Sequence, residues 1–163
     1  RYTRYEVIGW QARGGGSAVS ISDARAPDAE WYGAAPEVIR ELRGADAEAV
    51  IARLHAAAAT YPYATTYSAW PGPNSNTFVA HLAREIPEMR LALPAHAVGK
   101  DYLPPGQLVA RSPSGTGAQV SLNGLFGVIV GGDEGFELNV LGLVVGVDPL
   151  RPALKVPGFG ALP

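Results

Sequence analysis

The most informative stretch of this chain is Trp70-Pro71-Gly72-Pro73-Asn74-Ser75-Asn76-Thr77-Phe78, which leads into an apolar helical pattern. The prolines stiffen the entry, the glycine permits a backbone path that other residues resist, and Asn, Ser and Thr side chains can cap a first turn. The free amides of a helix start and the helix dipole point the same way, so such a terminus attracts an anion or the polar head of a ligand. The stretch therefore predicts a helix start and a candidate binding site.

The residues after this stretch repeat with the spacing of an amphipathic helix. Its apolar members are Phe78, Val79, Leu82, Ala83 and Ile86. We expect His81, Arg84 and Glu85 to lie on the opposite, polar face, and Pro87 to end the helix.

Two further helices are expected before this one. The first begins near Pro36 and ends at Gly44, because proline suits a first helical turn and glycine suits a helix end. The second begins with Asp46 as its cap and continues to Thr60. Its apolar residues at helical spacing are Val50, Ile51, Leu54 and Ala58.

Strands are expected at both ends of the chain. Residues 1–10, including Trp10, and residues 18–21 form a hairpin around three glycines at 14–16. Residues 119–122 and 125–130 form a second hairpin around Asn123-Gly124, a turn that matches strand twist. Residues 136–140 and 143–147 follow, and their nearly continuous apolar character favours strands covered on both faces, or on one face by another chain.

These elements predict an α+β fold in which an antiparallel sheet is packed by about three helices, chiefly by the one that residues 74–77 begin. Residues 91–106 contain three prolines and little periodicity, which predicts a long surface loop. Loops of that length usually carry a function, so Lys100, Asp101 and Tyr102 become candidate ligand contacts.

Composition limits the possible partners. The 163 residues, 47% of them apolar, suit a single domain over 1–163. Thirteen basic against fifteen acidic residues, with no basic cluster, argue against a nucleic-acid partner. Cysteine is absent, and no histidines or carboxylates recur at ligand spacing, so we expect neither a metal site nor a cofactor. The chain opens at Arg1 without methionine, so we expect an upstream portion in which a signal or membrane anchor could lie.

Three blocks of sequence carry a resemblance to a known family. They are residues 70–79, Gly99-Lys100-Asp101-Tyr102, and Gly146-Val147-Asp148-Pro149-Leu150-Arg151-Pro152-Ala153-Leu154-Lys155. In this order they resemble a bacterial family catalogued as domain of unknown function 3750. The resemblance implies a cell-envelope protein, periplasmic or membrane-anchored through an upstream segment, and gives no activity or cofactor.

The run Asn74-Ser75-Asn76-Thr77-Phe78-Val79 also resembles the nucleophile-bearing helix start of permuted papain-like and NlpC-type domains. That resemblance implies a papain-like architecture and places Ser75 where those domains carry a cysteine. A serine hydroxyl needs a base to take its proton. The three histidines are His55 on another helix, His81 on a different side of the same helix, and His96 in the long loop, and their spacing does not select one as this base.

Three hypotheses follow. In the first, the chain is a non-catalytic or degenerate papain-like module that binds a polar or anionic small ligand or an envelope protein partner. Its ligand-binding residues would be Trp70, Asn74, Asn76, Thr77, Lys100, Asp101 and Tyr102, beside the Ser75 hydroxyl. In the second, Ser75 is the catalytic nucleophile of an amide or ester hydrolase acting on cell-wall or lipid material. In the third, the apolar C-terminal strands mediate self-association or contact a membrane complex.

Overall fold

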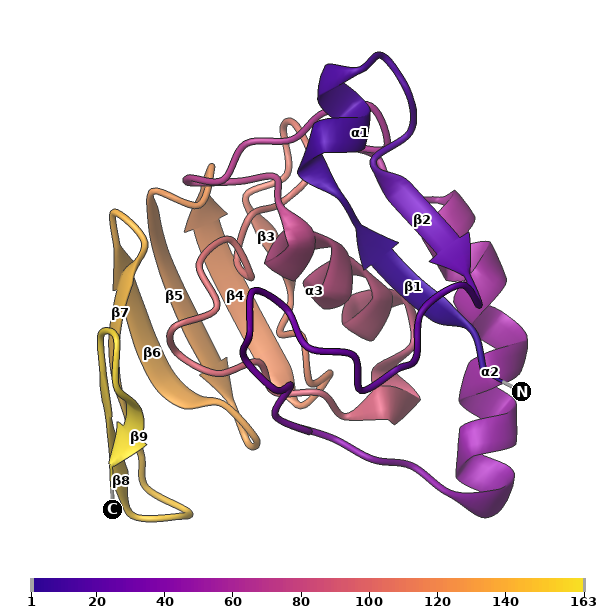
Figure 1. Cartoon of the computed structure of the whole chain (residues 1–163). Helices are drawn as coiled ribbons and strands as arrows, with labels where there is room; N and C mark the ends of the chain where they lie inside the picture. The colour runs from indigo at the N-terminus through magenta and orange to yellow at the C-terminus, as the bar shows by residue number, and fades with distance from the viewer. Residues whose placement is uncertain (1, 163) are drawn as a thin grey trace.

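The computed structural model describes residues 2–162 and confirms the α+β class (Figure 1). Its first half contains β1 (Arg4–Val7), α1 (Gly9–Arg13), β2 (Val19–Ser22), α2 (Gly44–Ala59), α3 (Ser75–Glu85) and the 3-10 turn η1 (Pro87–Met89). Its second half contains β3 (Val109–Arg111), β4 (Gly117–Leu122), β5 (Phe126–Gly131), β6 (Gly135–Val140), β7 (Leu143–Asp148), β8 (Ala153–Val156) and β9 (Gly160–Leu162).

Helix α3 lies between the β1–β2 hairpin with α2 on one side and the larger sheet on the other (Figure 1). On the first side, Phe78, Leu82 and Ile86 of the predicted apolar stripe are buried against Val7 and Val50. This apolar core fixes the hairpin and α2 to the helix, because burying each large side chain contributes roughly 1.5–3 kcal/mol.

The other side of α3 contacts residues 91–103, which we call the buried segment. Ala80 and Ala83 of the helix pack against Leu91, Leu93 and Ala97 of this segment. The sequence correctly predicts an irregular segment here, but the prediction that this segment lies on the surface is wrong. Prolines prevent regular structure there, yet alternate side chains from Leu91 onward point inward, so the segment forms a layer between helix and sheet.

The larger sheet is a seven-stranded antiparallel meander in the order β3-β4-β5-β6-β7-β8-β9. The predicted hairpin at Asn123-Gly124 is confirmed: both residues have positive φ, and Leu125 N donates to Leu122 O at 3.0 Å. Helix α3 reaches this sheet through the buried segment and the Arg84 side chain, whereas it packs directly on the small hairpin.

The two faces of this sheet differ in polarity. The inner face turns toward the buried segment and carries polar side chains with almost no exposure, among them Gln119, Ser121, Glu137 and Asn139. The outer face is apolar except for one arginine; its side chains, by register, are those of Val109, Arg111, Ala118, Val120, Leu122, Phe126, Val128, Val130, Phe136, Leu138, Val140, Leu143, Val145, Val147, Leu154, Val156 and Leu162. Within the described chain no element covers this face. The first alternative given by the sequence, strands covered on both faces, is therefore wrong for this sheet.

Three local predictions in the first half are wrong. Trp10 belongs to α1 rather than to a strand, because β1 already ends at Val7. Residues 36–43 are irregular, and Gly44 begins α2 instead of ending a helix. Asp46 lies inside the first turn of α2, whose cap position is Arg43. Val38 and Ile39 remain 77% and 47% exposed, so a short helix at 36–43 would bury too little apolar surface to be stable.

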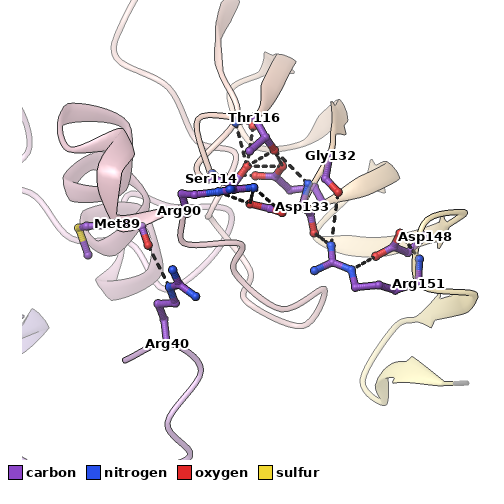
Figure 2. A network of polar contacts seen from close by, with 11 residues as sticks. Arg40, Met89, Arg90, Ser114, Thr116, Gly132, Asp133, Asp148 and Arg151 are labelled. Atoms are coloured by element: carbon purple, nitrogen blue, oxygen red, sulfur yellow. Dashed lines mark hydrogen bonds and ion pairs between the residues drawn. The ribbon is translucent and has the colours of Figure 1, made fainter. Parts of the chain in front are cut away.

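One end of the sheet is held by the polar network in Figure 2. Arg90 and Asp133 form an ion pair at 3.0 Å, and Arg151 binds Asp148 at 2.8 Å. Nearby, the buried Glu134 carboxylate accepts hydrogen bonds from the backbone and the hydroxyl of Ser114. These contacts join the turns between strands to the residues that follow α3. No helix within residues 2–162 has the length and apolar character needed to cross a membrane.

Candidate functional site

The start of α3 is built as the sequence predicts. Asn74 Oδ1 accepts a hydrogen bond from Thr77 N at 3.1 Å, and Asn74 N donates to Thr77 Oγ1 at 3.0 Å, which together form a capping box. Gly72 has φ of 140°, and a Cβ there would lie 3.0 Å from Thr77 Oγ1. Only glycine therefore fits the chain's approach to this cap.

The cap also ties α3 to the buried segment. Thr77 Oγ1 donates to Gly99 O at 2.8 Å, and the amide groups of Asn74 and Asn76 each donate to Val98 O at 2.9 Å. Asn74 and Thr77 are buried in this arrangement. Their polar atoms serve the helix start and its neighbour, so their predicted ligand contacts stay predictions.

Lys100 and Asp101 are buried under the sheet rather than exposed. Lys100 Nζ lies 2.6 Å from Glu137 Oε2 and donates to Leu93 O, while Asp101 accepts from Asn139 Nδ2 at 2.7 Å. Burial lowers the pKa of Lys100, although Glu137 opposes the change, and burial raises the pKa of Asp101. The pair therefore belongs to the inner-face network, and its role as a ligand contact also stays a prediction.

The two aromatic candidates, Trp70 and Tyr102, make different contacts. Trp70 is 53% exposed, and its Nε1 donates to Leu141 O at 2.9 Å, which joins the helix entry to the β6–β7 turn. Tyr102 packs edge-on against Tyr63 with ring centroids 5.6 Å apart. Burial, followed by the charge of a neighbouring Tyr102, raises the pKa of Tyr63 to about 12.

Ser75, the first residue of α3, is exposed and opens onto a cavity of about 470 Å³. We call this the Ser75 cavity; its walls come from β1, α1, residues 27–36, Tyr67 and Ser75 itself. Of the residues predicted as a site, all of which are described, Ser75 is the one that lines it. The sequence stretch therefore does lead to a cavity, but mainly through its serine.

The residues that form most of this cavity were not predicted. Trp10 and Trp31 stack with ring centroids 5.7 Å apart and an interplanar angle of 7°, and Tyr32 meets Trp31 edge-on. Arg4 and Arg13 supply positive charge, and Glu6 pairs with Arg4 at 2.8 Å. A signal was present in the sequence, since two tryptophans occur among polar residues where no core pattern requires them.

A general base for Ser75 is not provided by a histidine at this cavity. No histidine is among the described residues that line it. His81 instead faces α2, with Nε2 3.0 Å from Ala57 O and 3.2 Å from Thr60 Oγ1. Residues 2–162 also hold no cluster of three or more metal-binding side chains.

The family described as protein of unknown function, DUF3750, matches residues 1–102. The chain belongs to this family. Two of the three resembling blocks, 70–79 and 99–102, lie inside the DUF3750 match, and the block at 146–155 lies beyond it. No curated protein and no solved structure matches the chain. The Ser75 cavity is formed wholly by residues within the DUF3750 match, whereas the seven-stranded sheet follows it.

Proposed function

We propose that this chain is a non-catalytic ligand-binding domain of the bacterial envelope and that the Ser75 cavity is its site. The ligand is a small molecule with an anionic or polar group attached to a flat apolar part. The observation that carries the proposal is the exposed Ser75 hydroxyl at the amino end of α3, opening onto a cavity walled by stacked tryptophans and arginines.

The polar end of the ligand would lie between α3 and α1. Ser75 and Asn76 occupy the first turn of α3, where backbone amides have no partner within the helix. The helix dipole adds partial positive charge at this point. Arg13 is exposed in the last turn of α1 and lines the same cavity, so it can approach an anion there. Glu6 offsets the charge of Arg4, which leaves Arg13 as the cation better placed to select an anion.

The flat part of the ligand would contact the aromatic wall. Trp10 and Trp31 lie nearly parallel and are 56% and 43% exposed, so ring surface is open to solvent. The Arg25 guanidinium lies 5.4 Å from the centroid of the Trp31 ring, and this cation–π contact helps to fix the position of the ring. A volume of about 470 Å³ falls within the range of small-molecule sites.

Binding without catalysis fits the chemistry of this cavity better than hydrolysis. A serine hydroxyl becomes nucleophilic only when a base within hydrogen-bond reach removes its proton. The described lining residues include no histidine, and the one carboxylate among them, Glu6, is paired with Arg4. Ser75 therefore acts as a hydrogen-bonding group.

The tryptophans provide a direct test. The chain has three, of which Trp10 and Trp31 line the cavity and Trp70 does not. Titration with phenyl phosphate, followed by NMR of the indole N–H groups, should shift the Trp10 and Trp31 signals and leave Trp70 unchanged. Arg13→Ala should weaken binding about three- to tenfold, since one charge-assisted hydrogen bond contributes about 1 kcal/mol or more. Arg43→Ala, an exposed arginine outside the cavity, is the matched control.

Neutral benzyl alcohol should bind more weakly than phenyl phosphate and should not distinguish Arg13→Ala from the unmodified chain. Equal shifts at all three indoles, or equal affinity for the two probes, would refute the proposed site. A fluorophosphonate that labels the chain and fails to label Ser75→Ala would overturn the non-catalytic part of the proposal in favour of a serine hydrolase.

A further inference from the structure

The outer face of the seven-stranded sheet is a second feature that the Ser75 cavity does not explain. Sixteen of its seventeen side chains are apolar, and most are more than a third exposed, for example Val120 at 54% and Leu143 at 62%. Their cross-strand partners on this face, such as Leu138 with Val145, are also apolar, so the exposed surface is continuous across the strands.

The size of this face lies at the upper limit of what a free surface ordinarily presents. Seven strands of up to about six residues, at about 4.8 Å between strands and about 3.3 Å per residue, project over roughly 600 Å². A soluble monomer's largest apolar patch is about 300–600 Å². A stable protein interface takes about 800 Å² from each partner, which the uneven side-chain surface of this face approaches.

The chemistry of the face favours a second copy of this chain as the occupant. Arg111, at the end of β3, is the single charged member of this face. Two copies packed through it about a two-fold axis would therefore not bury rows of like charges. A lipid surface is less suited: the turns at one end of the sheet, residues 123–125, 141–142 and 157–159, contain no lysine or arginine to bind anionic headgroups, and Arg151 at the other end is paired with Asp148.

The shape of the face also suits packing against another sheet. A groove of about 330 Å³ runs between β4, β5 and β6 and is lined by apolar side chains that include Leu122, Phe126 and Leu138. Leu143 and Leu154, on β7 and β8, are more exposed and can enter such a groove on a partner. Two sheets that pack face to face interdigitate their side chains at about 10 Å.

We propose that this outer face is the surface through which two copies of the chain associate, sheet against sheet. The proposal is independent of the Ser75 cavity, because no residue of this sheet lines that cavity.

Light scattering coupled to gel filtration tests it. The unmodified chain should have twice the 17.0 kDa mass of one copy. The double variant Leu138→Lys with Val145→Lys, which places two charges at one cross-strand pair, should have the mass of one copy. Val38→Lys, at an exposed apolar residue away from the sheet, should keep the doubled mass. Circular dichroism and a thermal melt establish that each variant is folded.

A chain without cysteine allows a second measurement that does not depend on folding of a charged variant. Val145→Cys should cross-link between copies with a short bismaleimide, and Val38→Cys should not. A single-copy mass for the unmodified chain overturns the proposal, as does a doubled mass that the lysine pair leaves unchanged. Sedimentation of a single-copy chain with phosphatidylcholine–phosphatidylglycerol vesicles, lost in the lysine pair, would overturn it in favour of a lipid surface.

Discussion

Glu137 and Leu138 are neighbours on β6, yet Glu137 is 1% exposed and Leu138 is 38% exposed. The same reversal occurs on β4, where Gln119 is buried and Val120 is exposed. An antiparallel sheet with one face on a core ordinarily buries its apolar residues and exposes its polar ones. In this chain the inner face is held by paired charges and hydrogen bonds. Most apolar side chains of the sheet therefore lie on the exposed outer face.

The inner face holds its charges through specific partners. Glu137 lies between two lysines, with Lys100 at 2.6 Å and Lys155 at 2.5 Å. Among the described residues, Glu137 Oε2 has no partner with the geometry of a hydrogen bond. The ion pair with Lys100 is what stabilises this buried oxygen. A network of this kind need not add stability over an apolar core, but removing one partner leaves a buried charge uncompensated.

The largest effect is therefore expected at Glu137. Glu137→Gln should lower the free energy of unfolding by about 3–5 kcal/mol, because Lys100 and Lys155 would then be buried without a counter-charge. Urea denaturation at low protein concentration, where association does not contribute, measures this. Leu138→Gln, one residue along and on the outer face, should cost less than about 1 kcal/mol. Equal costs at the two positions would refute the comparison.

A smaller effect is expected where backbone and side chain approach closely on the inner face. A Cβ at Gly127 would lie 2.6 Å from Asp101 Oδ2 and 3.0 Å from Val120 O. Gly127→Ala should therefore destabilise the chain by about 1–3 kcal/mol, through displacement of the Asp101 carboxylate. Val128→Ala, the next residue and on the outer face, serves as control in a thermal melt. A stable Gly127→Ala variant would mean that the inner face is loosely packed.

These comparisons also show what the sequence could predict. The start of α3 was predictable because Asn74 and Thr77 are three residues apart and cap one another locally. The Asn123-Gly124 hairpin was predictable for the same reason, since a tight turn depends on its own residues. Both predictions rest on interactions within a few residues of chain.

The orientation of the sheet depends on contacts between distant residues, and here the prediction was incomplete. The alternation Phe136-Glu137-Leu138-Asn139-Val140 is visible in the sequence, but it does not say which set is buried. That choice is made by Lys100 and Asp101, which meet Glu137 and Asn139 only after residues 91–103 pass beneath the sheet. The Ser75 cavity likewise joins residues 4–13, 27–36 and 75 through tertiary structure.

A further prediction concerns the charge of Asp101. Burial raises the pKa of this carboxyl in the folded chain, so the folded state holds the proton more strongly than the unfolded state. Its contribution to stability is therefore present at low pH and is lost as pH rises through the raised value. Asp101→Asn, which can still accept from Asn139 Nδ2, should gain stability relative to the unmodified chain as pH rises above about 4. Urea denaturation at several pH values measures the difference; one that does not change with pH would contradict it.

The smallest effect is expected at His81, on the apolar side of α3 and away from the sheet. Burial lowers the pKa of His81, opposed by the carbonyl of Ala57, so the folded state resists protonation more than the unfolded state does. Stability should therefore fall as pH decreases below about 6.5, by less than about 1 kcal/mol at pH 5, and His81→Gln should remove this dependence. The pH responses of His81 and Asp101 have opposite signs, because burial disfavours the charged form of each and one group is a base while the other is an acid. If both variants altered the same pH range in the same direction, a single global change would account for them, and the distinction between the apolar core and the charged inner face would fail.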